Sequence, residues 1–277
     1  MCAIVNTIRL VKGKGAMKKF AMGNIHGTVL FIDIKNFLGI SGILNPKNTC
    51  QFVMQVIEPL SDSIQNHHGY VCQIQGDAIM AVFGLEKKDD HHAYYAVECA
   101  LEMQKILNMI NPVKINDICI PVSARIGICS GDLYACQLYV AGKREFTVLG
   151  KTVNLASRYQ KINKYYDTKI LIDESVFAYI KNDIVTRKLD KIEIEGCKEL
   201  VQVYEVVFFR VTGNEEDTLK KAHYEKGLAY YFQGNWDEAI ECFSRVAENK
   251  ASYLMIKRCK YNKALQEFSL TDDETHK

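Results

Sequence analysis

Residues 28–37 read TVLFIDIKNF, a stretch in which an apolar run meets a single carboxylate. The run Thr28–Ile32 predicts a short buried strand, and Asp33 stands where that strand ends. A carboxylate in this place is costly to bury unless it is paired. Two interpretations follow from these residues alone: Asp33 caps the helix after the strand, or it binds a ligand.

A second carboxylate stands at the tip of a predicted hairpin. Residues 70–83 read YVCQIQGDAIMAVF, and the two strand-like runs that flank Gly76 and Asp77 predict a tight β-hairpin. Gly-Asp also suits a simple turn, so the hairpin alone assigns no role. A strand end and a neighbouring hairpin tip can bring two carboxylates together, which a pair of magnesium ions at a phosphate requires.

The remaining pattern up to residue 208 alternates helices and strands after an irregular, basic stretch over residues 1–27. Asn45 followed by Pro46 marks the start of the first long helix. Further helices are expected over 93–107, 152–162 and 174–181. Further strands are expected over 118–128, with a break at 130–131, in a pair joined near residue 142, over 169–172, and in two runs ending near residue 208. This order predicts an α/β (α+β) fold, with a mixed, ferredoxin-like sheet and helices packed on one face.

A composition shift at residues 212–217 (TGNEED) reads as a linker to a small α-helical C-terminal extension. Helices are expected over 224–232, 236–247 and 251–268, and the run GLAYYFQGNWDEAIECF resembles one tetratricopeptide repeat. One repeat cannot bury its own core, so this tail should pack on the main domain or on a partner. The expected domains are residues 1–26, 27–208 and 209–277.

Composition limits the classes of function. The chain has 277 residues with a net charge of +2, so nothing global indicates a nucleic-acid partner. Its 10 cysteines form no C-x-x-C pair, which favours a reducing, cytoplasmic location over a zinc cage or a disulfide framework. No apolar window approaches 18 residues, so no membrane span is expected.

Four segments now carry a specific resemblance: TVLFIDIKNF, GDAIMAVFG, ARIGICSGD and REFTVLGKTVNLASR. In this order and at these spacings they resemble a class III adenylate/guanylate cyclase catalytic domain over about residues 27–208. The resemblance implies conversion of ATP, or alternatively GTP, to the cyclic nucleotide with two Mg²⁺ or Mn²⁺ ions. It also implies a homodimer with two shared sites, and it leaves room for a regulatory protein or an upstream sensor as a further partner.

The resemblance implies a role for each matching residue. Asp33, Asp77 and the backbone carbonyl of Ile34 would hold the metal ions. The backbone amides of Ile34, Lys35, Asn36 and Phe37, together with Arg125, would bind the phosphates. Asn154 would orient the ribose and Arg158 would stabilise the transition state. Their i, i+4 spacing independently places both side chains on one helix face, although Arg158 taken alone also suits a solvated surface arginine.

Several positions depart from the family pattern. Base recognition would fall to Gln73, whose amide suits either purine, and to Thr147, which favours ATP. In the late segment IEGCK, Glu195 and Cys197 occupy positions where the family carries phosphate-binding lysines. Residues 11–20 (VKGKGAMKKF) resemble that missing element or form a solvated basic tail. The chain is therefore an active cyclase, or a degenerate cyclase fold that binds nucleotide or serves as a regulatory partner.

Overall fold

The computed structural model describes residues 9–12, 17–20, 22–85, 90–140, 142–194, 199–209 and 215–274. The chain divides into two compact units. The first comprises Met1–Asn163 and Lys169–Asn182, and the second comprises Lys164–Thr168 and Asp183–Lys277.

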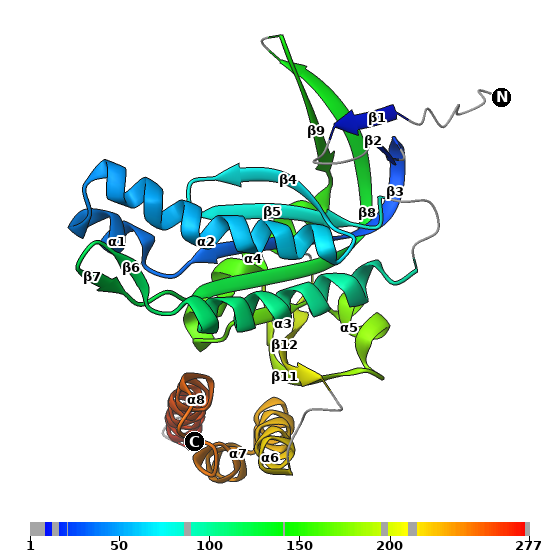
Figure 1. The fold of residues 1–277 in the computed structure, drawn as a ribbon. Coiled ribbons are helices and arrows are strands. Elements are labelled where there is room, and N and C mark those ends of the chain that lie inside the picture. The colour runs from blue at the N-terminus through cyan, green and yellow to red at the C-terminus, as the bar shows by residue number, and fades with distance from the viewer. Residues whose placement is uncertain are drawn as a thin grey trace, which may run out of the picture. The chain divides into compact units, whose positions relative to one another are not determined.

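A mixed sheet forms the centre of the first unit (Figure 1), and its strands run in the order β10-β8-β3-β5-β4. β10 is parallel to β8, whereas the other neighbours are antiparallel and β9 pairs with the far part of β8. The bounds are β3 Gly23–Ile34, β4 Tyr70–Gln75, β5 Ala78–Phe83, β8 Ala124–Val140, β9 Lys143–Leu149 and β10 Ile170–Ile172. Two separate hairpins pair β1 Arg9–Lys12 with β2 Met17–Phe20, and β6 Val113–Ile115 with β7 Ile118–Ile120.

The helices associated with this sheet are α1 Phe37–Ile43, α2 Pro46–Asn66, α3 His92–Ile110, α4 Lys151–Tyr166 and α5 Glu174–Ile180. The predicted start of α2 is confirmed: Asn45 Oδ1 accepts a hydrogen bond from the backbone N–H of Asn48 at 2.9 Å, and Pro46 occupies the first turn. The apolar face of α2 buries Phe52, Val56, Leu60 and Ile64. The capping residues therefore predicted the start of α2, and the amphipathic pattern predicted the face that it buries.

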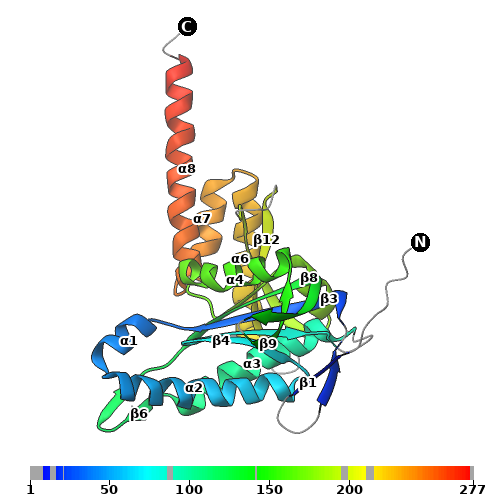
Figure 2. The same ribbon diagram turned by 90° about the horizontal axis from the view of Figure 1, so that it is seen from above.

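Helices cover both faces of the sheet, which corrects the expectation of one covered face. The hydroxyl of Ser130 on β8 contacts that of Thr28, which in turn bonds to His92 Nδ1 on α3 at 2.7 Å. Gly127 and Gly131 point to the opposite face because side chains alternate along a strand. A Cβ on Gly127 would lie 2.1 Å from the backbone nitrogen of Gln160 on α4. Figure 2 accordingly shows α2 and α3 on one side of the sheet and α4 on the other.

Other expectations also require correction. β8 continues through Ser130 and Gly131 instead of breaking there, because Gly131 serves the close approach of α4: a Cβ would lie 2.6 Å from Thr152 Oγ1. The N-terminal stretch is not wholly irregular, since β1 and β2 pair and β3 already begins at Gly23. α1 was not among the expected helices, and its N-cap position is Asn36, so Asp33 does not cap it.

The second unit contains an antiparallel pair, β11 Ile184–Ile192 and β12 Val201–Phe209, and the helices α6 Glu215–Phe232, α7 Trp236–Ser244 and α8 Lys250–Glu274. Tyr224 on α6 is fully buried, and its hydroxyl donates to the carbonyl oxygen of Leu189 at 2.9 Å. The Arg187 guanidinium lies 4.3 Å from the centre of the Tyr224 ring. The helical tail therefore packs on the strand pair that precedes it.

Candidate active site

The end of β3 is the point where the predicted carboxylates meet. Asp33 lies opposite Ala78 on β5 and opposite Arg125 on β8. Asp77 immediately precedes Ala78 in the hairpin turn, so the antiparallel register places it beside Asp33. Residues opposite each other on neighbouring strands project on the same face. Asp33, Asp77 and Arg125 thus gather at one corner of the sheet, on the face covered by α4.

This corner carries concentrated negative charge. Burial, and after it the hydrogen bond and negative charge of Asp33, raise the pKa of Asp77 to about 7. The backbone N–H groups of Asp77 and Ile34 donate to the same carboxylate and lower its pKa in part. Two carboxylates this close disfavour simultaneous ionisation unless a cation accompanies them.

The donor set fits a magnesium-type ion that is bound together with its substrate. Mg²⁺ is usually held by one or two carboxylates and by substrate phosphates, and it keeps several waters. Across the described ranges, no three His, Cys, Asp or Glu side chains converge on one point, so a dedicated protein cage of the zinc type is not seen there. Asp33 and Asp77, with the carbonyl of Ile34 next in the chain, supply hard oxygen ligands of the expected kind.

Gln160 on α4 also reaches this corner, and the sequence interpretation missed it. Its Nε2 donates to Asp33 Oδ2 at 3.4 Å, and the side chain is buried. The available signal was spacing: Gln160 lies four residues after Ala156, on the face of α4 that packs against β8. A polar residue on a buried helix face needs a partner, and here the partner is the carboxylate at the end of β3.

The turn after Asp33 leads directly into α1. Asn36 adopts a left-handed conformation with φ of 61°, and α1 begins at Phe37. The backbone N–H of Lys35 donates to the carbonyl oxygen of Ser123 at 2.8 Å, and that of Ile40 donates to the carbonyl oxygen of Asn36 at 3.1 Å. A phosphate held by the predicted amides of residues 34–37 would therefore compete with an existing hydrogen bond at Lys35.

The side chains of Asn154 and Arg158 do not face the carboxylates of Asp33 and Asp77. Both lie on α4, where Asn154 is exposed and Arg158 is half-buried. At about 100° per residue, Asn154 projects roughly 160–200° away from Ala156 and Asn163 on the buried face. Gln160 lies on the face of α4 that packs on β8, and it contacts Asp33. Asn154 and Arg158 lie on the opposite face, which points away from the Asp33–Asp77 pair of the same chain.

The predicted base-recognition residues lie on two strands, β4 and β9, that do not pair with each other. Gln73 lies on β4 opposite Met80 and is exposed, whereas Thr147 lies on β9 opposite Cys136 and is half-buried. The rings of Tyr70 on β4 and Phe146 on β9 meet edge to face at 5.1 Å. A bulge after Val71 restores Tyr70 and Gln73 to the same face of β4.

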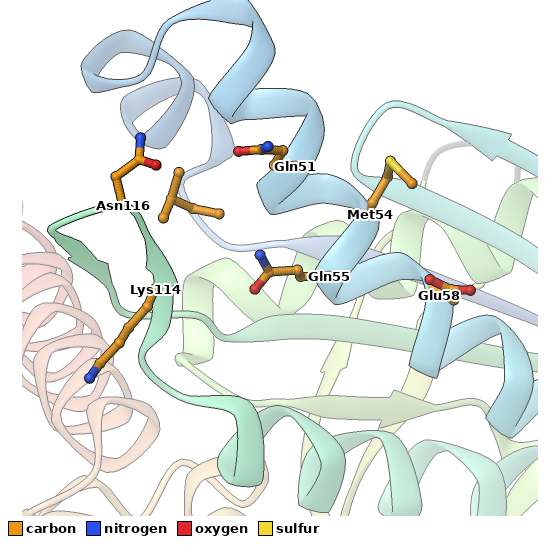
Figure 3. A pocket seen from close by; sticks show the side chains of 7 residues that line it. Gln51, Met54, Gln55, Glu58, Lys114 and Asn116 are labelled. Carbon is orange, nitrogen blue, oxygen red and sulfur yellow. The ribbon is translucent and has the colours of Figure 1, made fainter.

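Glu195 and Cys197 lie outside the described residues. A separate hollow of about 350 Å³ lies between α2 and the β6–β7 hairpin (Figure 3). Its lining comprises Gln51, Met54, Gln55, Glu58, Lys114, Ile115 and Asn116. None of the predicted site residues is among them, so this hollow is not the nucleotide site considered above.

In the described part of the chain, no helix combines the length and the apolar character needed to cross a bilayer.

Comparison with known families gives two matches. Residues 11–207 match the family described as adenylate and guanylate cyclase catalytic domain. Residues 221–252 match the tetratricopeptide repeat. The cyclase match covers well over half of the chain, and the repeat match falls on α6, α7 and the start of α8.

Individual relatives agree with these matches. The chain is 28% identical over 180 residues to adenylate cyclase 1 of Rhizobium meliloti (strain 1021), covering 65% of this chain and 27% of that protein. It is 30% identical over 186 residues to an adenylate cyclase of Anabaena cylindrica, covering 65% of this chain and 36% of that protein. The chain thus spans only about a third or less of these relatives' lengths.

A solved structure is similar over the same region. The guanylate cyclase domain of RhGC from Catenaria anguillulae, determined in complex with GTP, superposes with a TM-score of 0.58 at 27% sequence identity. The similarity covers 68% of this chain and 98% of that domain.

The raised pKa of Asp77 predicts how the metal-free protein responds to pH. The pKa is about 7 in the folded state and about 4 when unfolded, so the folded state binds the proton more tightly. Stability therefore falls as pH rises from 4 towards 7. We expect Asp77→Asn to stabilise the protein by about 1–2 kcal/mol at pH 8, allowing for partial exposure, and by almost nothing at pH 4.

This prediction is checked by urea unfolding in EDTA at several pH values. Asp62→Asn, on the exposed face of α2, is the matched control and should give no such pH-dependent gain. A gain from Asp77→Asn that is equal at pH 4 and pH 8 would contradict the electrostatic interpretation.

Proposed function

Because this chain belongs to the adenylate and guanylate cyclase catalytic domain family, we propose that it converts ATP to 3′,5′-cyclic AMP and pyrophosphate. The observation that carries the proposal is that Asp33 and Asp77 lie side by side, with Arg125 opposite Asp33 on the neighbouring strand. Members of the family are generally metal-dependent, and a pair of carboxylates at one corner suits a metal-bound triphosphate.

The first group of residues would bind the metal ions and the phosphates. Asp33 and Asp77, with the carbonyl of Ile34, would hold two Mg²⁺ or Mn²⁺ ions. When bound, such ions lower the pKa of an attacking hydroxyl and offset phosphate charge. Arg125 and the amides of the turn at residues 34–37 would bind the phosphates, because cations and orphan N–H groups favour anions.

The second group of residues acts on the ribose and on the reacting phosphorus. Asn154 would orient the ribose so that its 3′ oxygen attacks the α-phosphorus while pyrophosphate leaves. Arg158 would stabilise the charge that develops on the pentavalent phosphorus, as arginines do in other phosphoryl transfers. Both functions require the side chains to reach a nucleotide that is bound at a carboxylate pair.

The geometry of α4 supports a homodimer with two shared sites. Its buried face directs Gln160 to the carboxylates of the same chain, while Asn154 and Arg158 project from the other side. A two-fold dimer supplies the missing half, because each chain then offers its α4 face to the partner's carboxylates and receives the same in return. One chain contains both halves, so a second copy suffices.

ATP is the favoured substrate for two reasons. Adenylate cyclases are among the relatives similar to this chain, and Thr147 is the residue that favoured ATP in the sequence. GTP is the alternative, since the exposed amide of Gln73 can donate and accept and a similar domain was solved with GTP.

The direct test is a cyclase assay with purified protein, Mn²⁺ and either nucleotide, with the cyclic product identified. We expect cyclic AMP, and we expect Asp33→Ala and Asp77→Ala each to lower turnover by about 100-fold or more, because each removes a metal ligand. Circular dichroism should show an intact fold. Near-normal turnover in either variant would refute the assigned metal site.

Shared sites predict complementation between inactive chains. Asp77→Ala and Asn154→Ala should each be inactive alone, yet a mixed dimer contains one site that carries neither change. An equal mixture forms about half heterodimers with one intact site each, so activity should recover to about a quarter of the parent. Absence of recovery in mixed dimers verified by two affinity tags would exclude sites shared in this way.

Base recognition predicts a change of selectivity. Gln73→Lys should raise the ATP/GTP ratio of kcat/KM by about ten-fold, because an ammonium donates to adenine N1 and cannot accept from guanine N1–H. Gln75→Lys, at another exposed position of β4, is the matched control. Equal ratios in the parent and in Gln73→Lys would show that residue 73 does not contact the base.

A further inference from the structure

The second unit contains a buried carboxylate that no step of the proposed reaction uses. Asp190 on β11 is 1% exposed. Its Oδ2 accepts from the hydroxyl of Tyr166 at 2.6 Å and also from Nη1 of Arg258 on α8, while Oδ1 accepts from the backbone N–H of Lys191 at 2.8 Å. We refer to Tyr166, Asp190 and Arg258 as the clasp.

Burial, and after it the negative charge of Asp190, raise the pKa of Tyr166, so the phenol keeps its proton and remains a donor. The Asp190 carboxylate is therefore satisfied by two side chains from different helices. A buried carboxylate deprived of a partner is strongly unfavourable. The three side chains consequently hold one another in a single arrangement.

Tyr166 is the last residue of α4. Residues 164–168 belong to the second unit, while the remainder of α4 belongs to the first. α8 makes a second contact with this end of α4: Lys250 Nζ donates to the carbonyl oxygen of Lys164 at 3.1 Å. A lysine at a helix C-terminus satisfies an orphan carbonyl and complements the helix dipole.

The same helix carries Asn154 and Arg158. At about 1.5 Å per residue, Arg158 stands roughly 12 Å and Asn154 roughly 18 Å from the end that the clasp holds. An α-helix of this length transmits a shift or rotation of its end as a rigid rod. The clasp therefore holds the C-terminal end of the helix that carries both side chains.

We propose that Arg258 is a positioning residue: through Asp190 and Tyr166, α8 of the tetratricopeptide-like tail fixes α4 and so aligns Asn154 and Arg158 on the partner's nucleotide. The inference rests on the proposed shared sites. It gives the tail a positioning role, whereas the sequence suggested only a helical cap on the main domain or on a partner.

Mixed dimers separate alignment from simple stability. In the mixture of Asp77→Ala and Asn154→Ala chains, the one intact site takes its carboxylates from the Asn154→Ala chain and its α4 from the Asp77→Ala chain. Arg258→Met added to the Asp77→Ala chain should lower the recovered activity at least ten-fold, with the loss in kcat and not in KM. The same change added to the Asn154→Ala chain should alter activity less than two-fold.

Two further variants keep the test interpretable. Lys263→Met breaks an exposed ion pair between α8 and Asp237, and it should change activity less than two-fold in either chain. Tyr166→Phe removes one hydroxyl and leaves the Arg258–Asp190 pair, so it should reproduce the asymmetry if Arg258→Met fails to fold. Equal losses in both chains, or no loss in either, would overturn the proposal.

Hydrogen exchange, measured in chains that carry neither Asp77→Ala nor Asn154→Ala, provides a readout that does not depend on activity. Amides of residues 161–166 should exchange at least ten-fold faster in Arg258→Met and at an unchanged rate in Lys263→Met. If the parent mixture recovers no activity, the shared-site function is wrong, and unchanged exchange in Arg258→Met then overturns the clasp as well. Faster exchange that is confined to Arg258→Met would support the clasp even if the shared-site function is wrong.

Discussion

The register of β3 against β5 and β8 keeps Asp33 beside Asp77 although their charges repel. Thr28 on β3 is fully buried, and its hydroxyl contacts that of Ser130 on β8 and the ring of His92 on α3. A slip of one residue would turn Thr28 to the other face and leave these buried polar groups without their partners. The buried hydrogen bonds thus fix the register, and the register fixes the carboxylates. The raised pKa of Asp77 is the electrostatic cost of that placement, and a bound cation would offset it. Such local destabilisation is typical of sites kept for function.

The close contact of α4 with β8 has a comparable consequence. Gly127 allows the helix backbone to approach the strand, and Asn163 Nδ2 bonds to the carbonyl oxygen of Ile126 at 2.9 Å. α4 therefore cannot rotate freely about its axis, because rotation would break this bond and press the helix against the strand. This contact decides which residues of α4 face outward, whereas the clasp holds the C-terminal end of the helix. A site that needs Asn154 and also a carboxylate pair is completed most directly by a second chain.

The sequence predicted those parts of the fold that local chemistry determines. The start of α2 follows from Asn45 and Pro46, and the β4–β5 hairpin follows from Gly76 and Asp77. α1 was missed because FLGISGI contains two glycines and follows Asn36, whose side chain makes no cap hydrogen bond. The expected break in β8 was wrong because Gly131 signals a turn and a close helix approach equally well, and only the tertiary structure distinguishes them.

The residues of the candidate site were likewise only partly predictable from the sequence. Asp33 and Asp77 could be nominated from their places at a strand end and a hairpin tip, but their proximity depends on a register that the sequence does not state. Gln160 could be found only after the buried face of α4 was known. Asp190 stands in a strand among charged neighbours, where an exposed aspartate is the ordinary expectation. Its burial depends on helices that arrive from both earlier and later in the chain.

The chemistry of the clasp explains why a charged contact suits the end of α4. An apolar contact of equal volume would stabilise the unit as well or better, but it would tolerate sliding of α8 along β11. A buried carboxylate does not tolerate it, because any shift that removes Arg258 or Tyr166 leaves Asp190 without a partner. The ionic contact therefore contributes specificity of position more than stability. A helix that must present Asn154 and Arg158 to another chain gains more from a defined position than from a tighter core.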